Sequence, residues 1–247
     1  MPDDLSHSHT PERIAERVRE ATKHNYLGDF VLGAVDGTVT TFAVVAGTAG
    51  ADLSPGVAII LGLANVLADG FSMAVGNYLS TRTEVELLEA ARRIEEQHIA
   101  LVPGGEREEI RQIFAGKGFD GELLEQVVDV ITRDRRRWVD TMLTEEHGLR
   151  LDTPSAMKAA VSVFIAFVIA GQLPLAPLYL SGQIPTDVRF QLCALLAGIT
   201  FFVIGIAKGR VVGQSWWKSG LETLFIGGLA ASAAYFVGAF LRGIVPV

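Results

Sequence analysis

The chain has 247 residues, of which 49% are hydrophobic and 20% charged, and it carries a formal net charge of −7. This composition excludes an ordinary soluble domain, and no nucleic-acid partner or organic cofactor is expected. Because the chain is both apolar and substantially charged, its charged residues must be segregated along the sequence.

Residues 1–26 form a polar segment without the short apolar core and small-residue cleavage site of a secretory signal, so we expect no cleaved leader. The stretch from Glu12 to Lys23 is typical of a partly amphipathic helix. His7 and His9 belong to this segment, and we assign them no role as ligands.

Four stretches without a lysine or arginine follow, residues 27–80, 159–188, 190–207 and 219–241, and they contain long apolar runs. A helix needs roughly 20 apolar residues to cross the hydrocarbon core of a bilayer. Two such helices are predicted within residues 27–80 and three within residues 155–247, near 28–50, 55–79, 157–180, 188–207 and 220–242. The fold class is therefore an all-α polytopic membrane protein with five transmembrane helices.

Details within these segments refine that prediction. Pro174 and Pro177 predict a broken or kinked end to the third helix. Cys193, the single cysteine, is interpreted as a packed thiol. Glu222 begins the fifth helix near Lys208, which favours a structural ion pair.

Basic residues determine the expected orientation, because cytoplasmic segments retain lysine and arginine during insertion. All but two of the 21 lysines and arginines lie in residues 1–26, in residues 81–158 or in the connection before the fifth helix; the exceptions are Arg189 and Arg242. We therefore expect the N-terminus and residues 81–154 in the cytoplasm and the C-terminus outside.

Two carboxylates lie inside the first two apolar segments, where an ionisable group costs about 2.5 to 3.5 kcal/mol. In an antiparallel hairpin, Asp36 and Asp69 both fall in the cytoplasmic half, and Met73 lies one turn beyond Asp69. These three residues are candidates for a cation path. The alternative is that each aspartate is held by Thr38, Asn65 or a backbone carbonyl for packing alone.

Residues 81–154 are predicted to form a small helical domain inserted between the second and third transmembrane helices. No helix breaker lies between Gly76 and Ala100, so the second transmembrane helix is expected to continue into this insert. Three shorter helices should follow the break at residues 103–105, with Asp120 capping the second of them and Asp134 near the start of the last.

Metal-ligand side chains recur in this insert at helical spacing. The pairs Glu95 with His98 and Glu106 with Glu109 are three residues apart, and Met142 with Glu146 four apart, so each pair shares a helix face. Carboxylate, imidazole and thioether together favour a first-row transition metal over Mg²⁺ or Ca²⁺. Single pairs of this kind are also common in solvated helices, which remains the alternative.

His147, next to Glu146, is interpreted as a helix-end residue.

The sequence as a whole resembles a known family, the vacuolar iron transporter family, over nearly the whole chain from residue 26. The resemblance lies in residues 35–40 (VDGTVT), residues 68–76 (ADGFSMAVG), residues 174–180, Lys208-Gly209-Arg210, and the run from Glu222 to Gly238.

The resemblance implies a homodimeric transporter, not an enzyme, that moves ferrous iron out of the cytosol with proton exchange; Mn²⁺, Co²⁺ and Zn²⁺ are alternative substrates. It assigns transport roles to Asp36 and Met73 and implies metal ligands at Glu95, His98, Glu106, Glu109, Met142 and Glu146. A bacterial inner membrane is expected, or a vacuolar membrane in a eukaryote.

The chain departs from the family pattern at His98, where many members have Glu, and at Asn77, where many also have Glu. The first departure concerns metal preference and the second a relay at the cytoplasmic end of the path. Two other functions stay open: a membrane-anchored metal sensor, and a di-iron carboxylate oxidase suggested by the Glu95-x-x-His98 spacing.

Overall fold

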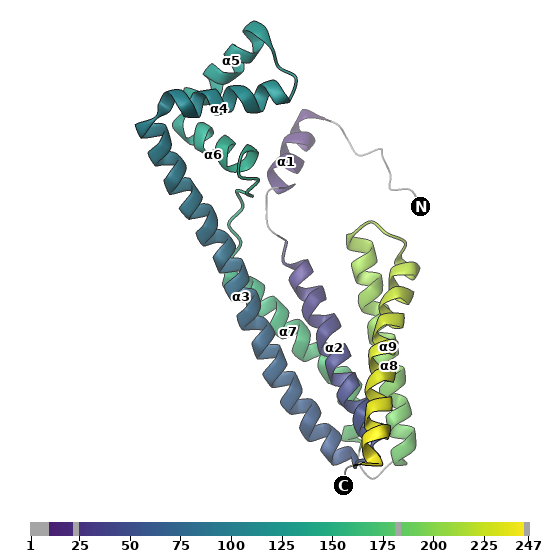
Figure 1. Cartoon of the computed structure of the whole chain (residues 1–247). Helices are drawn as coiled ribbons and strands as arrows, with labels where there is room; N and C mark the ends of the chain where they lie inside the picture. Colours follow the sequence, from purple (N-terminus) through teal and green to yellow (C-terminus); the bar gives the residue numbers. More distant parts are fainter. Residues whose placement is uncertain (1–9, 22–24, 181–183, 245–247) are drawn as a thin grey trace. The chain divides into compact units, whose positions relative to one another are not determined.

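The computed structural model describes residues 10–21, 25–180 and 184–244. The regular structure of these residues is entirely helical (Figure 1). The elements are α1 (Pro11–Ala21), α2 (Leu27–Gly50), α3 (Pro55–Leu101), α4 (Pro103–Gly116), α5 (Gly121–Thr132), α6 (Arg135–Glu145), α7 (Ala156–Leu175), the 3₁₀ helix η1 (Ala176–Tyr179), α8 (Thr186–Val211) and α9 (Trp216–Arg242).

Within the described residues, five helices are long and apolar enough to cross a membrane: α2, α3, α7 with η1, α8 and α9. Large apolar side chains on their outer faces are exposed, among them Phe71 at 66%, Phe236 at 69% and Phe240 at 70%. Aromatic rings displayed along several helices would be unfavourable in water and are expected against lipid. The predicted number of transmembrane helices is therefore confirmed.

The described helices fall into two compact units. We call Asn25–Leu79 with Ala156–Val247 the transmembrane unit, and Ser80–Ser155 the insert. The helix α3 contributes its first part to the transmembrane unit and its last part to the insert, and it continues without a break as expected from the sequence.

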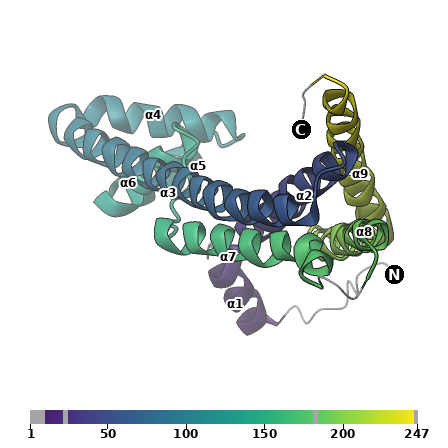
Figure 2. The ribbon, with the colours of Figure 1, turned by 90° about the horizontal axis from the view of Figure 1, so that it is seen from below.

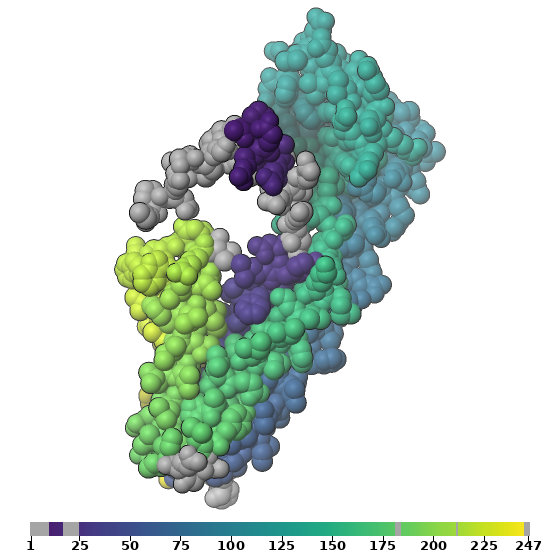
Figure 3. Space-filling view, turned by 180° about the vertical axis from the view of Figure 1, so that it is seen from behind, coloured from purple at the N-terminus to yellow at the C-terminus, as the bar shows by residue number. Residues whose placement is uncertain are grey.

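In the transmembrane unit, α2 packs against α7, α8 and α9 (Figures 1 and 2). The space-filling view shows the first part of α2 lying directly beside α7 (Figure 3). This closeness depends on glycine: a Cβ atom on Gly37 would lie 2.9 Å from the Cα atom of Phe167. Backbones can approach so closely only where side chains are absent, which is how membrane helices gain packing contacts.

The end of α7 follows the proline pattern. Pro174 lies inside the last turn, and the chain then tightens into the 3₁₀ helix η1, which contains Pro177. Cys193 on α8 is fully buried in an apolar cluster with Leu175 and Leu178, so its interpretation as a packed thiol is confirmed. Glu222 and Lys208 form the expected ion pair at 3.6 Å.

The insert has its own apolar core, formed by side chains of α3, α4, α5 and α6. Ile110, Val128, Met142 and Leu143 are fully buried in it. The helix α6 begins after Asp134, whose carboxylate accepts a hydrogen bond from the backbone N–H of Arg137 at 3.1 Å. This is an N-cap, because the side chain satisfies one of the free N–H groups of the first turn.

Two local predictions for the insert differ from the structure. The sequence predicts that Pro103 to Gly105 separate two helices, but α4 begins at Pro103, because proline lacks an N–H and fits the first turn of a helix. Asp120 precedes α5 at the N-cap position, yet its side chain makes no capping hydrogen bond.

Candidate metal centre in the insert

Glu95 lies at the centre of a cluster of carboxylates and imidazoles in the insert. It projects from α3 and is 2% exposed, while Glu106, in the first turn of α4, is 6% exposed. His98 follows Glu95 by one turn and is largely exposed; its Nδ1 atom is 4.0 Å from Glu95 Oε1 and 3.5 Å from Glu106 Oε1. The short turn between α3 and α4 therefore brings three predicted residues together.

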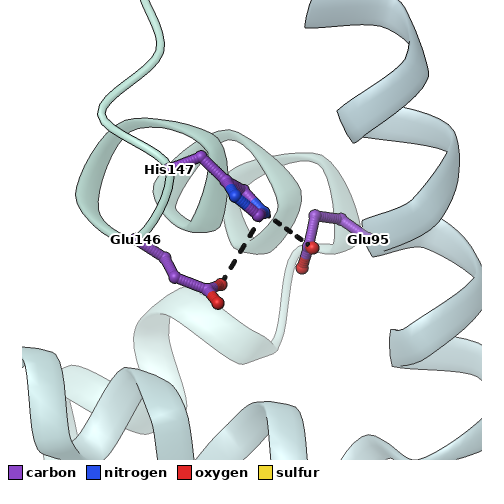
Figure 4. A group of neighbouring side chains, drawn as sticks. All are labelled: Glu95, Glu146 and His147. Atoms are coloured by element: carbon purple, nitrogen blue, oxygen red, sulfur yellow. Dashed lines mark hydrogen bonds and ion pairs between the residues drawn. The ribbon is translucent and has the colours of Figure 1, made fainter.

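The end of α6 supplies the other side of this cluster. Glu146 and His147 reach toward Glu95 (Figure 4), with His147 Nε2 at 3.0 Å from Glu95 Oε1 and 3.9 Å from Glu146 Oε2. The side chains of two three-residue groups, Glu95–His98–Glu106 and Glu95–Glu146–His147, each bring their potential ligand atoms within 4.8 Å of one another. Both groups contain Glu95.

Burial and like charge shape the titration of the cluster. Burial raises the pKa of Glu106 to about 7, with further contributions from the charges of Glu109 and Glu95. Burial also raises the pKa of Glu146, again assisted by Glu109. The hydrogen bond to Glu95 raises the pKa of His147. Negative charge is thus concentrated at a poorly solvated place, which a bound cation would relieve.

Two carboxylate oxygens of the cluster are left without a partner. Glu95 Oε2 and Glu106 Oε2 are buried and make no hydrogen bond within the described residues. A buried polar atom without a partner costs about 1 to 3 kcal/mol. Residues in this arrangement fit a divalent cation, because carboxylate and imidazole are ligands of first-row metals and the unbonded oxygens are available to it.

The remaining predicted ligands occupy different positions. Glu109 is exposed at the edge of the cluster, close enough to Glu106 and Glu146 to affect both electrostatically. Met142 lies in the apolar core of the insert, one helical turn before Glu146.

The predicted path residues lie in the transmembrane unit. Asp36 on α2 and Asp69 on α3 are half-buried and interact electrostatically, and Met73 is also half-buried one turn after Asp69. The Asn65 amide donates a hydrogen bond to the Asp69 carboxylate. Thr38 does not support Asp36, because its hydroxyl donates to the carbonyl oxygen of Ala34 at 2.8 Å.

Asn77, one of the two departures from the family pattern, has a defined contact. Its Nδ2 atom donates a hydrogen bond to Oδ1 of Asp29 at 2.9 Å, linking α3 to the first turn of α2. A glutamate at this position would place a second carboxylate opposite Asp29. The amide of Asn77 therefore puts a hydrogen bond between the two helices where a glutamate would put a repulsion.

His147 is the residue whose neighbours the sequence did not reveal. Its interpretation as a helix-end residue is confirmed, since α6 ends at Glu145, but the turn also directs its ring at Glu95, 52 residues earlier. Gly148 with φ +64° reverses the chain there. The sequence signal was the Glu146-His147-Gly148 run itself, in which glycine permits the left-handed turn. His7 and His9 lie outside the described residues.

The helices and the cluster together define a polytopic helical membrane protein with a carboxylate and imidazole centre suited to a metal ion. A model of the VIT family matches residues 27–239, so the chain belongs to the VIT family.

Several curated proteins are similar to the chain over most of its length. The vacuolar iron transporter of Toxoplasma gondii is 35% identical over 91% of this chain and 77% of its own. Vacuolar iron transporter 1 of Oryza sativa subsp. japonica is 32% identical over 93% and 88%, and that of Arabidopsis thaliana 32% identical over 91% and 91%. These relatives are named as transporters, which supports the prediction that the protein is not an enzyme.

Proposed function

We propose that the protein exports a divalent transition metal from the cytosol, with ferrous iron as the first candidate and Mn²⁺, Co²⁺ or Zn²⁺ as alternatives. The observation that carries the proposal is the cluster around Glu95, in which carboxylate and imidazole ligand atoms lie within 4.8 Å of one another. Glu95 and Glu106 each keep a second buried oxygen without a hydrogen bond among the described residues. Similarity to proteins named vacuolar iron transporter supports iron as the substrate.

The topology follows from the distribution of basic residues. Residues 81–154, which contain the cluster, carry eleven lysines and arginines, whereas Arg189 and Arg242 are the only basic residues assigned to the opposite side. The insert is thus a cytoplasmic metal-capturing domain, the N-terminus is cytoplasmic and the C-terminus is outside. The membrane is the inner membrane in a bacterium or the vacuolar membrane in a eukaryote.

In this proposal, metal captured by Glu95, His98, Glu106, Glu109, Met142 and Glu146 passes to Asp36, Asp69 and Met73. The path lies where two copies of the chain meet in a homodimer. The proximity of Asp36 and Asp69 supports a cation site, because a divalent cation offsets the repulsion between two carboxylates. Protons move in the opposite direction as each aspartate alternates between a proton and the metal.

Metal flux into proteoliposomes tests the path. Asp36→Asn removes the charge with little change of shape and should abolish iron transport. Asp52→Asn is the matched control, since Asp52 lies in the α2–α3 link, pairs with Arg242 at 2.6 Å and is away from the path. Wild-type flux in Asp36→Asn would exclude that residue from the path.

Metal stoichiometry tests the capture site. The double variant Glu106→Gln with Glu109→Gln should bind less metal, whereas Glu108→Gln with Glu122→Gln removes two exposed carboxylates of α4 and α5 and should not. Unchanged stoichiometry in the first variant would exclude both residues as ligands.

Comparing Fe²⁺, Mn²⁺, Co²⁺ and Zn²⁺ flux with and without a pH gradient identifies the substrate and the coupling. A metal sensor would bind without flux.

A further inference from the structure

The shortest contact between a histidine and a carboxylate in the cluster is made by His147, which was not among the predicted ligands. His147 Nε2 lies 3.0 Å from Glu95 Oε1, the shortest histidine-to-carboxylate distance among the described residues of the insert. Backbone hydrogen bonds hold the turn that carries the ring. The backbone N–H of His147 donates to the carbonyl oxygen of Met142 at 3.2 Å, and the backbone N–H of Leu149 donates to that of Leu143 at 2.8 Å.

The spacing of the atoms suits an ion held between them. With ligand bonds of about 2.1 Å, a tetrahedral ion separates its ligand atoms by roughly 3.4 Å. The distances from His147 Nε2 to Glu95 Oε1 and to Glu146 Oε2 are 3.0 and 3.9 Å, on either side of that value. Glu146 is exposed, so its side chain is free to rotate and bring Oε2 closer to His147 Nε2.

A hydrogen bond from His147 to Oε1 of Glu95 would leave the second carboxylate oxygen of Glu95 without a partner. Glu95 is 2% exposed and its second oxygen, Oε2, has no partner among the described residues. A buried carboxylate oxygen without a hydrogen bond is unfavourable unless it takes up a proton or a cation, so this oxygen is available as a ligand atom.

We propose that His147 is a direct metal ligand, acting with Glu95 and Glu146, so that the captured ion or ions take imidazole from both His98 and His147. Glu95 is then the carboxylate common to both three-residue groups. Two imidazoles favour borderline metals such as Zn²⁺, Co²⁺ and Fe²⁺ over Mn²⁺, which prefers oxygen. This inference rests on the proposed capture of metal by the insert and specifies its coordination.

X-ray absorption of the zinc-loaded, full-length protein in detergent counts bound imidazoles. Multiplied by the number of zinc ions per protein, this gives the number of zinc-bound imidazoles per protein. That number should fall by half in His147→Gln and by half in His98→Gln. Glutamine keeps an N–H donor for Glu95, so a merely structural hydrogen bond would survive the change. His24→Gln removes a histidine elsewhere in the sequence and should leave the count unchanged.

Affinity provides the second measurement. In His147→Gln, Zn²⁺ and Co²⁺ should bind at least about tenfold more weakly, while Mn²⁺ affinity changes less. Thermal unfolding of the metal-free variant checks that it is folded.

Wild-type imidazole count and affinity in folded His147→Gln would overturn the inference while leaving metal capture intact. If wild-type protein binds no more zinc than the Glu95→Gln with Glu106→Gln variant, the proposed capture at this cluster is wrong and the inference falls with it.

Discussion

Adding one methyl group between α2 and α7 tests whether close backbone packing holds Asp36 in place. In Gly37→Ala the new Cβ atom would lie 2.9 Å from Phe167 Cα and nearer still to the Phe167 carbonyl oxygen. These neighbours are backbone atoms of a helix and cannot turn aside as a side chain can. The two helices must therefore separate next to Asp36.

The size of the effect follows from that distance. Carbon atoms pack best at about 3.5 to 4.0 Å, so the helices must part by roughly 0.6 to 1.1 Å. Overpacking of this kind costs about 1 to 3 kcal/mol. A Cβ atom added to Gly28, on the same helix, would meet no atom within 4 Å. Gly28→Ala should instead be neutral or stabilising, by up to about 1 kcal/mol, because alanine is the better helix former.

Thermal or denaturant unfolding in detergent should therefore show opposite signs for the two alanine variants. Iron flux should fall in Gly37→Ala and stay at the wild-type level in Gly28→Ala, since only the first displaces Asp36. Equal stability and equal flux in both variants would show that the contact between α2 and α7 is looser than described and would refute the reasoning.

Three further predictions concern single contacts. Asn77→Ala should lower the unfolding free energy by about 1 to 2 kcal/mol through loss of the hydrogen bond to Asp29, and Asn77→Asp should lower it further, because a carboxylate then faces a carboxylate. Zinc affinity, measured by competition with a chelator, should fall as pH drops from about 8 to 6, since Glu106 has a pKa of about 7 and takes up a proton. Gly148→Ala should cost about 1 to 2 kcal/mol in the left-handed conformation and weaken zinc binding by displacing His147.

Each of these has an outcome that would contradict it. Asn77→Asp as stable as Asn77→Ala would mean that the Asp29 carboxylate is elsewhere. A pH dependence that persists in Glu106→Gln would assign the proton to another group. The same proton has a second expected effect: in the metal-free protein, the free energy of unfolding should rise as pH falls through 7, because the folded state holds the Glu106 proton more tightly than the unfolded chain does. Unchanged zinc affinity in Gly148→Ala would separate the turn from the site.

Features encoded by neighbouring residues were predictable from the sequence. The apolar segments indicate the five transmembrane helices, Asp134 the start of α6, and the spacing of Glu95 and His98 their common helix face. Pro103 is harder to interpret because proline both ends helices and begins them, and only the direction of the preceding chain decides which.

The neighbours of His147 could not be predicted in the same way. Its contact with Glu95 depends on where the end of α6 packs against α3, which is decided by the buried side chains of the insert core rather than by the residues beside it. The same is true of Asn77 and Asp29, which are 48 residues apart.

The contacts of α2 with its neighbours have a mechanical consequence. The α2 backbone touches that of α7 at Gly37, and Gly238 of α9 approaches the α2 backbone at Gly47. Where α3 approaches α7, by contrast, Gly70 faces the ring of Phe167. Backbone contacts resist sliding, whereas side chains can change rotamer. We therefore expect α2, α7 and α9 to move as one rigid body and α3 to shift more easily against α7.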